Sequence, residues 1–136
     1  SELIFLEGYL WDEGEPKSAF EICIENSKKT AMSLSDKFCV DRHKPHFLEL
    51  VKNKLDIVFA NESEIMSLID AHNFNQVIEF GRSIKKLLVI TRGDKGSICI
   101  DKDSVKEFKA EKNLKIVDLE VKKIWGRFYY VFLLKD

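Results

Sequence analysis

The stretch that decides the fold reads Val89-Ile90-Thr91-Arg92-Gly93-Asp94-Lys95-Gly96-Ser97-Ile98. It continues an apolar run that begins at Leu87, and such a run is typical of a buried strand. The run ends in a polar turn with two glycines, which permit positive φ and a close approach of the backbone to a ligand. The simpler interpretation is a hairpin turn between strands at 87–91 and 97–101, because most glycine-rich turns are plain turns.

The same turn also has the chemistry of an anion site. Successive backbone N–H groups in such a turn can form a concave site for an anion. Thr91 adds a hydroxyl group, and Arg92 and Lys95 add positive charge. The functional interpretation is therefore a phosphate-facing loop at the end of a strand, and it is compatible with the hairpin.

Length and composition indicate an ordinary globular domain. The chain has 136 residues, of which 45% are hydrophobic and 33% charged, with a net charge of −1. This is enough for one core, and the absence of a basic block argues against nucleic acid as a partner. The sequence shows no signal peptide and no transmembrane run. Its three cysteines, Cys23, Cys39 and Cys99, are far apart, so we expect reduced thiols, a cytoplasmic location and no membrane association.

Apolar runs alternate with helical patterns along the chain. Strands are predicted near 2–7, 31–34, 57–60 and 87–91, with helices between them, one of them at 46–53, and a loop at 35–41. This order predicts an α/β class with a Rossmann-like open, mainly parallel sheet and helices on both faces. The segment 97–108 reads as an antiparallel hairpin at one edge.

Four polar segments follow the predicted parallel strands, and ligands of open parallel sheets collect at this end. They are Glu7 to Asp12, Ser35 to Arg42, Asn61 to Glu64 and Thr91 to Gly96. Their shared edge is the structural reason for treating them as one site.

Two of these segments allow more than one interpretation. Asn61 can cap a helix that starts at Glu62, or the helix start can face a metal–phosphate complex. Cys39 and His43 with a nearby acid could form a cysteine nucleophile, although a solvated loop with a local Asp–Arg pair explains the same residues.

Several motifs together resemble the ribokinase-like (phosphofructokinase-B) family of carbohydrate and nucleoside kinases. Thr91 to Gly96 is similar to its T-x-G-x-x-G segment. The segments Glu7-Gly8-Tyr9-Leu10-Trp11-Asp12, Leu34-Ser35-Asp36-Lys37-Phe38-Cys39-Val40-Asp41-Arg42-His43 and Asp56-Ile57-Val58-Phe59-Ala60-Asn61-Glu62-Ser63-Glu64 are similar to adenosine-kinase-like members. The resemblance covers roughly residues 2 to 118, and the order and spacing of the motifs are its strongest feature.

The resemblance implies an ATP-dependent phosphotransferase that acts on a hydroxyl group of a small sugar or nucleoside. Its cofactors would be ATP and Mg²⁺. Asn61, Thr91, Arg92, Gly93, Asp94, Lys95 and Gly96 would bind the nucleotide, and Glu64 would act on the magnesium ion indirectly. A homodimer is one state of association open to it.

The sequence departs from the family at the residue that does the chemistry. Family members continue after Val117-Asp118 with a Gly-Ala-Gly-Asp turn whose last Asp is the catalytic base, and here Leu119 to Phe128 follow instead. We therefore assign no catalytic residue and divide the chain into a nucleotide-side portion, 1–118, and a divergent tail, 119–136. Three hypotheses stay open: a kinase fragment inactive alone, a nucleotide-binding α/β module without turnover, and a non-functional remnant.

Overall fold

The described residues of the computed structural model, 2–12 and 14–109, contain one six-stranded sheet in the order β1-β2-β3-β4-β5-β6. The strands are β1 (Leu3–Glu7), β2 (Lys29–Ser33), β3 (Ile57–Asn61), β4 (Leu87–Thr91), β5 (Ser97–Ile100) and β6 (Val105–Phe108). The α-helices are α1 (Pro16–Glu25), α2 (Lys37–Asn53), α3 (Glu62–Leu68) and α4 (Phe74–Ser83). The described residues also include two short 3₁₀ helices, η1 (Gly8–Asp12) and η2 (Gly93–Lys95).

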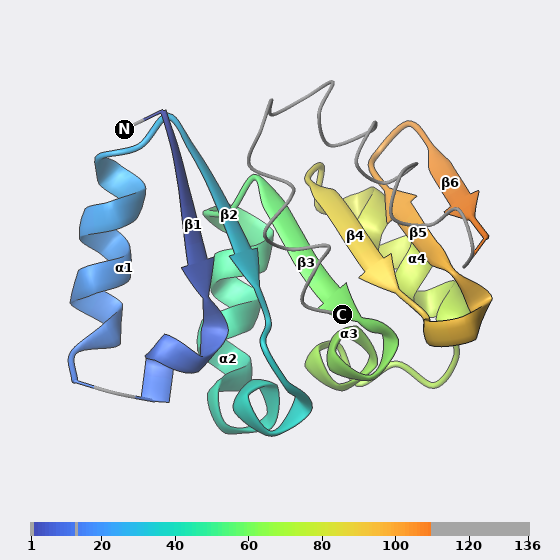
Figure 1. Ribbon diagram of the computed structural model, residues 1–136, viewed down its shortest axis with the longest axis horizontal. Helices are drawn as coiled ribbons and strands as arrows, with labels where there is room; N and C mark the ends of the chain where they lie inside the picture. Colours follow the sequence, from blue (N-terminus) through green and yellow to red (C-terminus); the bar gives the residue numbers. More distant parts are fainter. Residues whose placement is uncertain (1, 13, 110–136) are drawn as a thin grey trace.

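The first four strands are parallel neighbours, and β5 and β6 are antiparallel. The α/β class, the mainly parallel sheet and the antiparallel pair at one edge are thus confirmed. In Figure 1 the arrows of β1 to β4 all point toward the lower edge of the view, where η1, α3 and the β4–β5 turn gather. This edge is the carboxyl end of the parallel strands, so it is where a ligand is expected.

The helical layer differs from the expectation of helices on both faces. Among the described residues, the buried apolar side chains of the α-helices all join one core cluster, which also holds Met32, Val58 and Ile90 of the strands. The reason is topological. Each parallel strand is added on the same side of the one before, and right-handed crossovers in one direction place their helices on one face. Figure 1 shows α2 and α4 behind the same sheet face.

Both faces of the central strands are nevertheless apolar. Successive side chains of a strand point to opposite faces. Val58 and Leu88 therefore belong to the helical cluster, whereas Ile57 and Val89 belong to a second cluster on the other face. Continuous apolar runs of this kind are what a sheet buried on both faces requires.

Helix α2 is longer than the sequence indicated. The predicted loop at 35–41 is helical from Lys37, because the side chain of Asp36 caps the helix and accepts a hydrogen bond from the backbone N–H of Cys39 at 2.7 Å. Pro45 lies inside the helix, and His43 has non-helical angles, φ −120° and ψ 23°. Proline removes a helical hydrogen bond and kinks the chain, which is why the sequence suggested a separate helix that starts near residue 46.

The proposed boundary between residues 118 and 119 lies outside the described residues. Within the part of the chain that the structure describes, none of the helices combines the length and the apolar character needed to cross a membrane.

Gly8 is a packing constraint at the end of β1. A Cβ atom at this position would lie 2.9 Å from the carbonyl oxygen of Leu34 and 3.0 Å from that of Ser33. We expect Gly8→Ala to lower the free energy of unfolding by about 1–3 kcal/mol, because backbone atoms have to move. Urea denaturation measures this, with Ser18→Ala on the exposed side of α1 as the control, expected to stay within about 0.5 kcal/mol of wild type. Equal stability of the two variants would contradict the close approach.

Candidate functional site at the carboxyl edge of the sheet

The four polar segments predicted for the site all lie at one edge of the sheet. Glu7 is the register partner of Ser33, and Asn61 is the register partner of Thr91. The side chains nevertheless form two groups. One joins the end of β1 to the start of α2, and the other joins the start of α3 to the β4–β5 turn.

The first group is an ion-pair cluster around Asp12. Arg42 donates to both carboxylate oxygens, from Nε at 3.0 Å and from Nη2 at 2.5 Å, and Nε2 of His43 lies 2.5 Å from Oδ1. The hydrogen bond from Arg42 and the one with His43 lower the pKa of Asp12 to about 2. The local Asp–Arg pair expected within residues 36–43 is therefore wrong, because the acid comes from residue 12, in η1.

Cys39 in this group is not an activated nucleophile. Its side chain is buried, its sulfur donates to the carbonyl oxygen of Gly8 at 3.3 Å, and burial together with Asp12 and Asp36 raises the pKa of its thiol to about 11. A carboxylate oxygen of Asp12, the sulfur of Cys39 and a ring nitrogen of His43 lie within 4.8 Å of one another, close enough together to form a set of metal ligands. The carboxylate, however, already holds the Arg42 guanidinium. The cluster is best described as a clasp between η1 and α2.

The second group begins with a capping box at the start of α3. The side chain of Asn61 accepts from the backbone N–H of Glu64 at 2.8 Å, and the side chain of Glu64 accepts from the backbone N–H of Asn61 at 2.9 Å. Asn61 is exposed, whereas Glu64 is 6% exposed. The capping interpretation of this motif is confirmed, and a magnesium role for the two side chains stays a prediction.

The β4–β5 turn is held in shape by its own backbone. The N–H of Arg92 donates to the carbonyl oxygen of Gly96 at 2.8 Å, and the N–H of Gly96 donates to that of Gly93 at 3.1 Å. The φ angles of Gly93 and Gly96 are 59° and 90°, values that residues with a side chain rarely adopt. The hairpin interpretation is confirmed for the backbone, which leaves the anion-binding interpretation open.

Arg92 is engaged in a way that its sequence position did not reveal. Its guanidinium donates to both carboxylate oxygens of Glu62, at 3.2 and 3.4 Å, and its Cζ lies 3.7 Å from the centre of the Phe74 ring. Sequence reasoning missed Glu62 and Phe74 as partners. The only available signal was that Glu62 and Arg92 both lie just beyond the ends of predicted strands, 57–60 and 87–91.

A hollow of about 300 Å³ lies beside this turn. Its lining includes three cationic side chains, Arg92, Lys95 and Lys109, one acid, Glu107, and the ring of Phe108. Lys95 and Asp94 are both exposed. The balance of charge around the hollow suits an anionic ligand.

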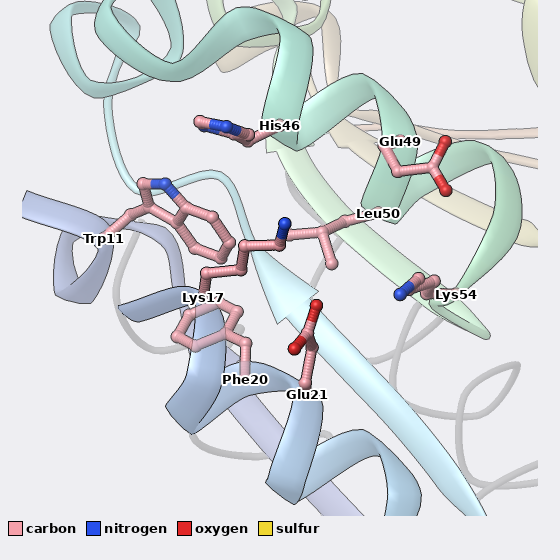
Figure 2. A pocket seen from close by; sticks show the side chains of 8 residues that line it. All are labelled: Trp11, Lys17, Phe20, Glu21, His46, Glu49, Leu50 and Lys54. Atoms are coloured by element: carbon pink, nitrogen blue, oxygen red, sulfur yellow. The ribbon is translucent and has the colours of Figure 1, made fainter. Parts of the chain in front are cut away.

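A second hollow, of about 110 Å³, lies between α1 and α2 (Figure 2). Its lining combines apolar side chains, Trp11, Phe20 and Leu50, with charged ones such as Lys17 and Glu49. Trp11 packs edge-on against Phe20, with ring centres 4.9 Å apart. None of the predicted nucleotide-binding residues lines this hollow, so it is separate from the candidate site.

The fold and this edge define an open α/β protein with a glycine turn and a capped helix start at neighbouring strand ends. The sequence profile of the pfkB family carbohydrate kinases matches residues 6–119. The chain belongs to this family, as the motifs predicted. Among curated proteins, none matches the chain at a significant level.

Solved structures support the same assignment. The adenosine kinase from Sinorhizobium meliloti is 33% identical, with a TM-score of 0.75, and the match covers 80% of this chain and 35% of that one. A probable sugar kinase from Rhizobium etli CFN 42 is 30% identical, with a TM-score of 0.74 and coverage of 79% and 34%. Anopheles gambiae adenosine kinase shares the fold at 18% identity and a TM-score of 0.67, with coverage of 97% and 46%. The chain thus spans between a third and a half of the length of these proteins.

The clasp around Asp12 predicts a stability loss in acid. Because the folded-state pKa of Asp12, about 2, is below its ordinary value of 3.8, ionised Asp12 stabilises the fold above that value, and the contribution disappears as the pH falls through about 2. We expect the free energy of unfolding of wild type to exceed that of Asp12→Asn at about pH 5 and to approach it near pH 2. Urea denaturation across this range is the measurement.

A matched control for this test is Glu79→Gln, which removes an exposed acid from α4. The difference in free energy of unfolding between wild type and Glu79→Gln should change less over the same pH range than the difference between wild type and Asp12→Asn. A difference between wild type and Asp12→Asn that is constant with pH would contradict the ion-pair clasp.

Proposed function

We propose that this chain is the nucleotide-side portion of an ATP-dependent sugar or nucleoside kinase and that it binds MgATP at the Thr91–Gly96 turn. The observation that carries the proposal is the side-by-side placement of Asn61 and Thr91 at the carboxyl edge, in a chain that belongs to the pfkB family. In the complete enzyme the γ-phosphoryl group of ATP would pass to a substrate hydroxyl.

The turn offers two kinds of phosphate contact. Gly93 and Asp94 begin η2, and within the described residues their backbone N–H groups have no protein acceptor. The ammonium group of Lys95 is exposed beside them. N–H groups and a mobile cation are a common combination around phosphates.

Magnesium fits the start of α3. Mg²⁺ keeps several waters and takes oxygen ligands, so an exposed amide and a nearly buried carboxylate that already hold the helix start can meet it through water. Asn61 and Glu64 provide these groups. When bound, the ion would neutralise phosphate charge, which is the main requirement of phosphoryl transfer.

A binding module without turnover is the second candidate function. It is favoured by the sequence after Asp118, which lacks the Gly-Ala-Gly-Asp turn expected from the family resemblance. In the complete enzyme, a nucleoside or a sugar would be the substrate, by analogy with the adenosine kinase from Sinorhizobium meliloti and the probable sugar kinase from Rhizobium etli CFN 42.

Two glycines of matching geometry test the binding site. Gly93 and Gly14 have φ of 59° and 60°, and at either one an added Cβ meets nothing within 4 Å. Val at these positions therefore strains the backbone to a similar degree. By calorimetric titration of MgATP, we expect weak binding by wild type and by Gly14→Val, and loss of binding by Gly93→Val.

Asn61→Ala extends this test to the metal. We expect it to weaken ATP binding when magnesium is present and to have little effect in EDTA. Equal binding by wild type and Gly93→Val would show that the turn is only a hairpin. Failure of wild type to bind would show that this chain is not a binding module.

Phosphoryl transfer by the chain alone is expected to be absent. A positioned general base is typically worth about 10²–10⁴-fold in rate, and no residue is assigned to that role. Incubation of the purified chain with ATP and adenosine or ribose should give no product above background. Robust turnover would show that another acid, with Asp118 the first candidate, acts as the base.

A further inference from the structure

Arg92 lies where the two parts of the candidate nucleotide site meet. It follows Thr91, whose register partner is Asn61, and its side chain reaches Glu62, the residue after Asn61. The ion pair thus joins the two residues that directly follow Asn61 and Thr91, the last register pair of β3 and β4. No other ion pair among the described residues joins the β4–β5 turn to a helix.

The backbone of Arg92 also closes the turn. Its N–H donates to the carbonyl oxygen of Gly96 at 2.8 Å, and its carbonyl oxygen accepts from the N–H of Lys95 at 3.1 Å. Any movement of Arg92 would therefore be transmitted to both ends of the turn.

The side chain of Arg92 is fixed from two directions. Glu62 binds its edge at two points, and the ring of Phe74, the first residue of α4, lies against its face. The side chain is only 17% exposed, and that of Glu62 is 33% exposed. The charge of Arg92 is consequently matched within the protein, which leaves Lys95 as the exposed cation on the turn.

We propose that Arg92 is a positioning residue that braces the phosphate-facing turn against the start of α3, with Glu62 and Phe74 as its anchors. The inference rests on the proposed function for its consequence, which is that the turn and the magnesium-facing helix start act as one unit. In this role Arg92 does not contact the phosphates itself, whereas the family resemblance implied that Arg92 binds the nucleotide.

An arginine is specifically required for this arrangement. The planar guanidinium can bind a carboxylate with two parallel N–H groups and stack on a ring at the same time, whereas a lysine ammonium is a point charge that cannot do both. Arg92→Lys therefore removes the brace and keeps the charge. Glu62→Gln keeps the size of the partner and removes its charge.

The first measurement is hydrogen exchange of the full chain without nucleotide. Both Arg92→Lys and Glu62→Gln should accelerate exchange at the amides of Lys95 and Gly96, which donate hydrogen bonds within the turn, and leave β1 and β2 unchanged. The matched controls are Arg82→Lys and Glu79→Gln, which alter exposed residues of α4, and they should not affect the turn. If both site variants leave exchange at the amides of Lys95 and Gly96 unchanged, the inference about Arg92 is wrong whatever the protein binds.

The second measurement is MgATP affinity, and Glu62→Gln gives opposite results for the two roles of Arg92. A brace predicts that Glu62→Gln and Arg92→Lys both weaken binding, by roughly fivefold, as expected for a partly exposed ion pair with a stacked ring. A direct phosphate ligand predicts that Glu62→Gln strengthens binding, because it frees the guanidinium from a competing carboxylate.

Magnesium dependence separates positioning from a general loss of structure. In the braced site, Arg92→Lys should reduce the gain in ATP affinity that magnesium produces by more than it reduces the affinity in EDTA. Equal losses of ATP affinity with magnesium and in EDTA would contradict the inference that the turn and the start of α3 act as one unit. If exchange accelerates but wild type does not bind MgATP, the brace stands and the proposed function fails, so the two ideas can be rejected separately.

Discussion

The parallel pairing of β3 with β4 is the constraint on which the candidate site depends. The pairing runs from Ile57 opposite Leu87 to Asn61 opposite Thr91. Both strands are buried and apolar on both faces, and a slip by one residue would move every side chain to the opposite face. Burial therefore sets the register, and the register places an amide and a hydroxyl side by side at the end of the strands.

The order of the strands adds a second constraint. Because each parallel strand follows its predecessor on the same side, the crossover helices share one face and α2 and α3 begin at the carboxyl edge. Their first turns are closed by Asp36 and Asn61, whose side chains accept backbone N–H groups. The same edge thus collects polar residues that both cap helices and face a ligand, which is why capping and binding are not exclusive roles here.

Two arginines at this edge each form an ion pair that joins different elements of the fold. Arg42 ties α2 to Asp12, and Arg92 ties the β4–β5 turn to Glu62. In each case the positive charge is matched by an acid about 30 residues away in sequence. The arginines therefore act mainly between elements, and Lys95 is the residue of the turn whose positive charge is exposed to solvent.

Sequence alone determined the strands, most of the helices and the polar edge, because burial periodicity, glycine turns and Asn caps are local signals. It also determined the family, since the order of motifs such as Thr91 to Gly96 is a property of the chain. Tertiary structure decided that the helices of the described residues form a single layer, that α2 continues through the kink at His43, and which partners Arg42 and Arg92 have. These features depend on which segments meet in space, and no local pattern of residues contains that information.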